Sequence, residues 1–186
     1  MLQIYNTLTG QKETFHPLTE NRVGVYVCGV TVYDYCHLGH ARTYVSADVL
    51  IRYLHFRGFE VNYVRNITDI DDKIIKRAKE NQEPYTAVTQ RFIKAMHDDF
   101  SALAILNPNH EPKATEFIPH MITLIKTLVD KNHAYVASNG DVYFNVRSFP
   151  SYGCLSHHDL DELESGARVE VSDVKRDALD FYQLKF

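Results

Sequence analysis

The chain has 186 residues, of which 45% are hydrophobic and 24% charged, and its formal net charge is −4. That length suffices for one good-sized domain with a small appendage, and the composition is ordinary for a soluble globular protein. No apolar run approaches the roughly 18 residues of a membrane span. Residues 1–6 lack the pattern of a secretory signal, so we expect a cytoplasmic protein with no membrane partner. A net-acidic chain needs a local basic patch or another domain to bind RNA.

The first half of the chain predicts a strand–helix–strand unit. Residues 22–28 form a β-branched and aromatic run that ends at Gly29, which is typical of a buried strand followed by a turn. A helix is expected over 38–56 and a second strand over 59–67. Such βαβ units are right-handed and pair their strands in parallel, so the sequence predicts an α/β fold. The apolar face of the helix is expected to contain Leu38, Ala41, Val45, Val49, Tyr53 and Phe56.

Further helices are predicted after this unit. Asp71 or Asp72 is expected to cap a short helix over 73–79. Pro84 favours the start of a longer helix that continues to about residue 103, and another helix is expected over 117–131. The core-facing stripe predicted for the longer helix consists of Val88, Phe92, Met96 and Phe100.

The last third of the chain predicts a small β element. Asn139-Gly140 lies between two strand-like runs within 134–146, and this dipeptide in such a place is the strongest short-range signal of a β-hairpin. Residues 157–180 are rich in Asp, Glu and His and are predicted to form an exposed loop with a short helix. The hairpin therefore indicates an insertion or a second small domain rather than a continuation of the parallel sheet.

Two histidines, three residues apart, stand where the first helix is expected to begin. In the sequence His37-Leu38-Gly39-His40 both rings face the same side of the helix start. First-turn N–H groups and the helix dipole favour an anion there, and Gly39 would let a flat base or a phosphate approach the backbone. We therefore predict an ATP phosphate site, in which the imidazoles donate hydrogen bonds to the α-phosphate. The alternative is two surface histidines, but a place just after a buried strand favours the site.

A thiol ends the first predicted strand, in the sequence Cys28-Gly29-Val30-Thr31. Three cysteines in all indicate free thiols or metal ligands rather than a disulfide framework. From its position alone Cys28 is best interpreted as a small buried hydrophobe, with a metal ligand and a nucleophile as the alternatives. A zinc site of Cys28, Cys36, His37 and His40 would consume the histidines that the phosphate site needs, and it follows no familiar spacing.

Polar residues follow the second predicted strand in Asn66-Ile67-Thr68-Asp69-Ile70-Asp71-Asp72-Lys73. The three carboxylates lack the glycine and the distant glutamate of a calcium loop, so we do not interpret them as a calcium site. Asn66 and Thr68 are the candidates for a functional role, because their polar groups stand beside the exit of the first strand.

Together these stretches resemble cysteinyl-tRNA synthetases, a family of class I aminoacyl-tRNA synthetases. Residues 30–40 look like the HIGH region of that family, and residues 28–31 and 65–74 look like its flanks. The later stretches Ala134-Tyr135, Asn139-Gly140-Asp141-Val142 and Gly166-Ala167-Arg168-Val169 also fit. The chain departs from the family at Asn132-His133, where a glycine is common, and it has no match for the downstream Trp-containing segment, the other three zinc ligands or the KMSKS loop.

The resemblance implies a Rossmann-like (HUP-type) parallel sheet, of which residues 1–110 would hold the first half and residues 111–186 the start of a connective insertion. It implies ATP-dependent activation of L-cysteine to cysteinyl-adenylate and its ligation to tRNA(Cys), with ATP bound together with Mg²⁺. His37 and His40 would be catalytic and, with Gly39, would bind ATP. The cysteinyl-adenylate would contact Gly29, Val30, Thr31, Thr43, Asn66, Ile67 and Thr68. Cys28 would be the first of four ligands of a zinc ion that binds the substrate thiolate.

The departures predict a truncated chain that is inactive by itself, because it lacks most zinc ligands, the KMSKS lysines and an anticodon-binding domain. We also expect a monomer. Two other functions stay open from the sequence. One is the related cysteine ligase of mycothiol synthesis, whose acceptor is an aminosugar. The other is a non-catalytic module that keeps the nucleotide pocket alone.

Overall fold

The computed structural model describes residues 2–158, 160 and 174–184. The chain divides into two compact units, residues 16–118, and residues 1–15 together with 119–186. The functional division expected at residue 110 stays a prediction. None of the described helices has the length and apolar character that crossing a bilayer requires.

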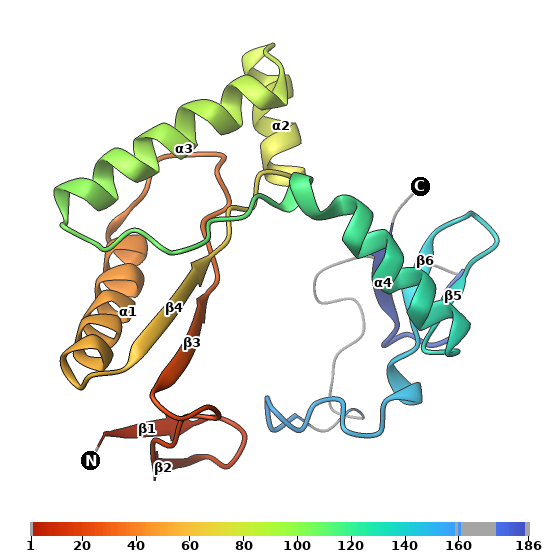
Figure 1. The fold of residues 1–186 in the computed structure, drawn as a ribbon. Helices are drawn as coiled ribbons and strands as arrows, with labels where there is room; N and C mark the ends of the chain where they lie inside the picture. The colour runs from red at the N-terminus through yellow and green to blue at the C-terminus, as the bar shows by residue number, and fades with distance from the viewer. Residues whose placement is uncertain (1, 159, 161–173, 185–186) are drawn as a thin grey trace. The chain divides into compact units, whose positions relative to one another are not determined.

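The unit of residues 16–118 is built on a pair of parallel strands joined by a helix (Figure 1). β3 (Arg22–Val27) pairs with β4 (Glu60–Arg65), and α1 (Leu38–Phe56) connects them. The register places Arg22 opposite Glu60 and Val27 opposite Arg65. The predicted βαβ unit and α/β fold are confirmed, because the β-branched runs form the strands and the three-to-four-residue period forms the helix.

The second edge of β4 is covered by an extended segment, residues 109–114, that the sequence did not indicate. The backbone N–H of Arg65 donates to the carbonyl of His110 at 3.1 Å, and that of Ile67 donates to the carbonyl of Pro112 at 2.9 Å. Parallel bridges form there, but no full strand does. Pro108 and Pro112 explain why the sequence predicts no strand here and why no full strand forms. Proline has no N–H to donate, and its presence argues against a strand.

Two helices follow β4, and both were predicted. α2 (Asp72–Asn81) is capped by Asp71, whose carboxylate accepts the N–H of Lys73 at 2.8 Å. α3 (Tyr85–Ala102) begins directly after Pro84. The predicted stripe of α3 is buried, and it belongs to a core that also contains residues of the loops after both strands. That core consists of Val30, Val32, Tyr44, Ile67, Ile74, Ala78, Val88, Phe92, Met96, Phe100 and Ile105.

The prediction of which face of α1 is buried is wrong. Leu38 is 88% exposed, Val49 61% and Phe56 83%, whereas the buried positions are Tyr44, Asp48, Ile51 and Leu54. The helix has apolar residues on two sides, and periodicity cannot tell which side meets the sheet. Asp48 is tolerated on the buried side because its carboxylate accepts the N–H of Leu106 at 2.8 Å and contacts the guanidinium of Arg52 at 2.6 Å.

A buried ion pair links β4 to the extended segment of residues 109–114. The side chain of Arg65 is 1% exposed, and its Nη2 lies 2.6 Å from Glu111 Oε1. Its guanidinium also lies over the ring of Phe100, 4.7 Å from the centroid. The other carboxylate oxygen of Glu111 lies 2.6 Å from His97 Nε2. A buried charge of this kind depends on its partner, because removing one member leaves the other unpaired in a low dielectric.

The unit of residues 1–15 and 119–186 contains two antiparallel elements. β1 (Gln3–Asn6) and β2 (Gln11–Thr14) form a hairpin that the sequence analysis did not predict. The predicted hairpin around Asn139-Gly140 is confirmed, with β5 (Ala134–Val136) paired to β6 (Val142–Phe144).

β7 (Phe181–Leu184) adds a third strand beside β6, and no sequence signal indicated it. Asp180, which precedes β7, is buried and accepts hydrogen bonds from the Tyr135 hydroxyl at 2.7 Å and from the Val146 N–H at 3.1 Å. Of the loop and short helix predicted over 157–180, residues 159 and 161–173 lie outside the described residues.

The other helical segments that the structure describes begin at Ala114. The helix predicted over 117–131 is a 3₁₀ turn, η1 (Ala114–Phe117), followed by α4 (Ile118–Asp130). A second 3₁₀ turn, η2 (Val146–Ser148), follows β6.

We predict that Glu111→Ala lowers the free energy of unfolding by about 3 kcal/mol, because it leaves the Arg65 guanidinium buried without its partner. The matched control is Glu116→Ala, whose carboxylate is exposed and pairs with Lys113 at 3.8 Å, and which should cost less than about 1 kcal/mol. Urea denaturation followed by circular dichroism measures both. Equal losses in the two variants would contradict the role given to the buried pair.

Candidate functional site

The two histidines at the start of α1 cap the helix themselves. The Gly39 N–H donates to His37 Nδ1 at 3.0 Å, and the His37 N–H donates to His40 Nδ1 at 3.1 Å. The rings lie nearly parallel, with 4.0 Å between their centroids and 32° between their planes. This reciprocal arrangement is a capping box in which imidazoles take the places of the usual serine and glutamate.

These bonds fix where each ring carries its proton. A backbone N–H can only donate, so each Nδ1 must accept and is unprotonated. Each neutral imidazole of the pair, His37 and His40, therefore holds its proton on Nε2. The site presents two Nε2–H donors from neighbouring, nearly parallel rings.

The helix start is less open to an anion than the sequence predicts. Two of the first-turn N–H groups, those of Gly39 and His40, already donate to His37, the first to its ring and the second to its carbonyl at 2.9 Å. The absent side chain of Gly39 makes room for the His37 ring, since an added Cβ would lie 2.7 Å from its Cε1 atom. These two bonds leave fewer first-turn N–H groups open to a phosphate than the sequence predicts, and the Nε2–H groups are further candidate donors.

The charge on one of these rings is suppressed. Partial burial lowers the pKa of His40 below its ordinary value, and the neighbouring His37 lowers that pKa further. Both causes act against the charged form, because burial removes water from it and a second imidazolium repels it. His40 is thus held as a neutral hydrogen-bond donor over a wider pH range than a free histidine.

The loops after β3 and β4 are joined at a very close approach of backbone to backbone. The Gly29 N–H donates to Asn66 Oδ1 at 2.7 Å, and a Cβ added to Gly29 would overlap the carbonyl oxygen of Asn66. The pairing continues with the Thr68 N–H donating to the Val30 carbonyl at 3.1 Å. Only glycine fits at position 29, so the sequence signal of a turn at Gly29 has a second cause in this contact.

One peptide group in this junction is held at both of its polar atoms. The carbonyl of Cys28 accepts the Tyr44 hydroxyl at 2.8 Å, and the N–H of the same peptide is the Gly29 donor that binds Asn66. Tyr44 comes from α1 and Asn66 follows β4, so the helix and the second strand both position this peptide. Burial raises the pKa of Tyr44 to about 12, which keeps its hydroxyl protonated as the donor.

The remaining residues predicted to contact the adenylate differ in their exposure. Val30 and Ile67 are buried in the core, so only their backbone atoms could meet a ligand. Thr31 and Thr68 face each other in a parallel bridge and are half-buried. Thr43 is exposed on α1, where its hydroxyl donates to the Gly39 carbonyl at 3.0 Å.

A zinc site does not form from the described residues. In residues 2–158, 160 and 174–184 no group of three or more His, Cys, Asp or Glu side chains could hold a metal ion. This rejects the arrangement of Cys28, Cys36, His37 and His40 within this structure. The interpretation of Cys28 as a buried hydrophobe is wrong, since its side chain is exposed. A single thiolate does not fit the four-ligand site that the resemblance implies, so Cys28 and its described neighbours would not hold zinc by themselves.

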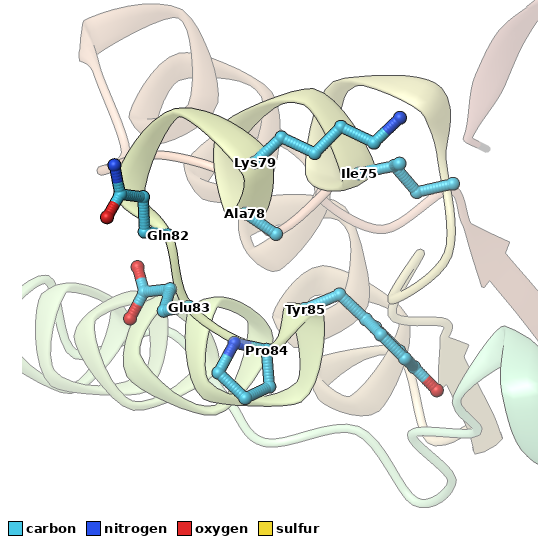
Figure 2. Close-up of a pocket in the computed structure, with 7 residues that line it drawn as sticks. All are labelled: Ile75, Ala78, Lys79, Gln82, Glu83, Pro84 and Tyr85. Atoms are coloured by element: carbon cyan, nitrogen blue, oxygen red, sulfur yellow. The ribbon is translucent and has the colours of Figure 1, made fainter.

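A separate pocket of about 470 Å³ lies where α2 turns into α3 (Figure 2). Its lining, drawn in Figure 2, consists of Ile75, Ala78, Lys79, Gln82, Glu83, Pro84 and Tyr85. None of the predicted site residues lines it. We place the candidate site at the helix start and the Gly29–Asn66 junction because the chemistry-bearing groups gather there.

Comparison with known proteins decides the family. Residues 14–186 match the family described as tRNA synthetases class I (C) catalytic domain. The chain belongs to this family. Its predicted likeness to the cysteine-specific class I synthetases is thereby confirmed.

Curated relatives agree with this assignment. The chain is 58% identical to the cysteine--tRNA ligase of Chromohalobacter salexigens over 180 residues, and 59% identical to that of Salmonella newport over 181 residues. Each match covers 97% of this chain and 39% of the relative. The synthetase-family chain therefore spans about two fifths of the length of the curated relatives it matches.

A solved structure supports the fold. Mycobacterium tuberculosis methionyl-tRNA synthetase, in complex with methionyl-adenylate, resembles the chain with a TM-score of 0.53 at 20% identity. The likeness covers 67% of this chain and 25% of that protein. Together with the parallel strands it confirms the Rossmann-like class of the synthetase-family chain.

The residues that the sequence did not indicate are those that hold the loops of the candidate site in position. Tyr44 and Tyr26 both hold the loops, the latter through its hydroxyl, which donates to Asn66 Oδ1 at 2.9 Å. Arg65 was assigned to the second strand and to a family flank, and its buried pair with Glu111 was not predicted. No pattern in the sequence indicated Tyr44.

We predict that Gly29→Ala lowers the free energy of unfolding by about 4 kcal/mol or more, because the methyl group would overlap the Asn66 backbone. Gly24 is a matched control in the same segment, since a Cβ there meets no atom within 4 Å. Gly24→Ala should change stability by less than about 1 kcal/mol. Urea unfolding of both variants is the measurement, and a Gly29→Ala variant as stable as the control would contradict the close approach.

We also predict that His40 titrates below the value of about 6.5 of an unperturbed histidine. His37→Asn should raise the His40 pKa only in part, because burial is the larger cause and stays. The depressed pKa means that this group stabilises the fold above its unfolded pKa and that the contribution is lost as the pH falls through the folded value. Ring-proton NMR titration tests this, and an ordinary or raised His40 pKa would refute it.

Proposed function

We propose that this chain forms the ATP- and adenylate-contacting part of a cysteine-activating site that serves ligation of L-cysteine to tRNA(Cys). The name shared by the curated relatives supports the reaction. Because the chain covers 39% of those relatives, the substrates of the whole protein, which are ATP with Mg²⁺, L-cysteine and tRNA(Cys), are part of the proposal. The single observation that carries the placement is the self-capped pair His37 and His40, which presents two Nε2–H donors.

The donors suit the charge that cysteine activation creates. A carboxylate oxygen of cysteine would bond to the α-phosphorus of ATP, while the bond from that phosphorus to the oxygen bridging to the β-phosphate breaks and pyrophosphate leaves. Negative charge grows on the α-phosphate oxygens as this happens, and donors fixed in advance stabilise it most. The capping bonds hold the His37 and His40 rings in place, so the Nε2–H groups need little reorganisation when the charge develops.

The adenylate would lie beside the Gly29–Asn66 junction. Gly29, Val30, Thr31 and Thr68 follow the carboxyl ends of parallel strands, where open α/β sheets bind ligands. Thr43, Asn66 and Ile67 complete the proposed set. Val30 and Ile67 would contribute backbone atoms, since their side chains are in the core.

Two substitutions at one position separate capping from ligand binding. Asparagine at position 37 keeps an acceptor near the place of Nδ1 but has no donor near Nε2, whereas glutamine offers a distal N–H but is a poor cap. We predict that His37→Asn weakens ATP binding at least tenfold with little change in stability. His37→Gln should retain most of the affinity and lose about 1 kcal/mol of stability. Calorimetric titration of ATP and urea unfolding give the two readouts.

The outcome that contradicts the proposal is equal ATP affinity in the wild type and His37→Asn, or no ATP binding by the wild type. Because the chain by itself is expected to be inactive, cysteine-dependent ATP–pyrophosphate exchange is measured with the unmatched part of a cysteine--tRNA ligase supplied, where loss of one donor should cost about 10²–10³ in rate. Offering tRNA(Cys) or glucosaminyl-inositol as the acceptor separates the tRNA ligase from the aminosugar ligase. Binding of ATP with no exchange under any condition would favour the non-catalytic module.

A further inference from the structure

The loop that leads from β3 to the histidine pair, residues 28–37, is bound by α2 (Figure 1). Lys73 and Arg77 lie one turn apart on α2, so their side chains lie on the same side of that helix. Lys73 Nζ lies 5.3 Å from the centre of the Tyr33 ring, and the Arg77 Nε–H donates to the Tyr33 carbonyl at 3.3 Å. Tyr33 is therefore held by α2 at both its ring and its backbone.

The guanidinium of Arg77 binds two acceptors of this loop at the same time. While Nε–H donates to the Tyr33 carbonyl, Nη2 donates to the carboxylate of Asp34. The other oxygen of that carboxylate accepts the Tyr35 N–H at 2.9 Å. A planar guanidinium presents its donors in a fixed fork, which a lysine ammonium cannot do. This one side chain thus fixes a backbone carbonyl, a carboxylate and, through the carboxylate, the N–H of the next residue.

The helix that carries Arg77 is itself held firmly. Ile74 is 0% exposed and Ala78 7%, and both belong to the core of the 16–118 unit. Asp71 caps the first turn of α2, and α2 packs against α3. A loop residue that is bound to such a helix is held, through the helix, by the core. The Arg77 contact can therefore restrict the loop more than a bond between two mobile surface groups.

The residues after Asp34 lead directly from this contact to the cap of α1. The ring of Tyr35 meets that of Phe92 on α3 edge-on, with 5.2 Å between the centroids, and Cys36 packs half-buried against the core. His37 follows as the N-cap with extended backbone, and its N–H is the donor to His40 Nδ1. The direction in which the chain enters residue 37 therefore decides whether the two rings can pair.

We propose that Arg77 is a positioning residue for the pair formed by His37 and His40, and that it acts through the loop of residues 33–36. Contact of Arg77 with a substrate is not part of the proposal. Its effect is to hold the loop so that the N–H of residue 37 meets His40 Nδ1 and both Nε2–H donors lie side by side. The value of that arrangement for cysteine activation rests on the proposed function, whereas the positioning itself does not.

The competing explanation is an ordinary surface ion pair between Arg77 and Asp34. Arg22 and Glu60 form such a pair at 2.9 Å, with side chains 68% and 72% exposed, whereas those of Arg77 and Asp34 are 33% and 47% exposed. Exposed pairs contribute little to stability, and an ordinary pair of this kind would leave the histidine rings as they are. The Arg77 fork differs because it also binds a backbone carbonyl of the loop, so its removal should release the loop locally.

The first test is NMR of the chain without ATP, cysteine or tRNA, so that it does not depend on the proposed activity. The ring centroids of His37 and His40 are 4.0 Å apart, so the wild type should show a nuclear Overhauser effect between their ring protons. Arg77→Met should reduce this effect by about half or more, because local opening of the loop separates the rings. Arg22→Met is the matched control and should leave the effect unchanged.

Variants of Asp34 show whether Arg77 acts through the carboxylate. Asp34→Ala removes the partner of Arg77 and the acceptor of the Tyr35 N–H, so it should reduce the ring-to-ring effect as Arg77→Met does. The combined variant should lose about as much as the larger single loss, because residues that act through one contact are not additive. Asp34→Asn keeps an oxygen for the Tyr35 N–H and should lose less than Asp34→Ala.

A ring-to-ring effect as strong in Arg77→Met as in the wild type, or an equal fall in Arg22→Met, would overturn the proposal. So would a wild type without the effect, since there would be no pair to position. Where Arg77→Met does not fold, Arg77→Lys takes its place, because it keeps the charge without the fork, and it should change the effect in the same direction.

Calorimetric titration of ATP is a separate readout. Arg77→Met should weaken ATP binding by about tenfold, because the donors are no longer held in advance, while its urea midpoint should be no lower than that of Arg22→Met. A wild type that binds no ATP, but whose ring-to-ring effect still falls in Arg77→Met alone, would contradict the proposed function and support the positioning role. ATP bound equally by the wild type and Arg77→Met would overturn the role of Arg77 in the site.

Discussion

The contact between Gly29 and the backbone of Asn66 is the constraint on which the candidate site depends. It brings the exits of β3 and β4 so close that no side chain fits between them. The peptide that carries the Gly29 N–H is also the peptide whose carbonyl binds Tyr44, so the first helix is tied to the same point. Beside this junction the Thr68 N–H donates to the Val30 carbonyl and the Val32 N–H donates to the Thr68 carbonyl, while the side chains of Val30 and Ile67 are in the core. The loops proposed to contact an adenylate are thereby held in position by hydrogen bonds to each other and to α1.

In the proposed function, each side chain of the histidine pair uses one nitrogen to cap the helix and the other to bind the ligand. Nδ1 of each ring closes the helix start, and that same bond sets the tautomer that leaves Nε2–H as a donor. A site built in this way needs no separate group to orient the rings, which other catalytic histidines obtain from a carboxylate or a carbonyl. In the proposed site, the anion would therefore be bound by the Nε2–H groups as well as by the helix dipole. Neutral donors fixed in place replace part of the role that the sequence assigned to open backbone N–H groups.

The helix that carries this pair also positions the loop after β3. Its inner side packs on β4, its Tyr44 binds the Cys28 carbonyl, and its N-terminus carries the two histidine rings.

The sequence alone determined the elements and their order where the signals are local. The β-branched run before Gly29, the helical period after His37, the cap at Asp71 and the Asn139-Gly140 turn each depend on neighbours along the chain, and all four appear in the structure. Its motifs also indicated the family and the two histidines. The tertiary structure decided which side of α1 is buried, because both sides are apolar and only the packed sheet chooses between them. It also decided that Arg65 pairs with Glu111 and that Tyr44 reaches Cys28, 16 residues away, since contacts between distant segments leave no periodic trace in the chain.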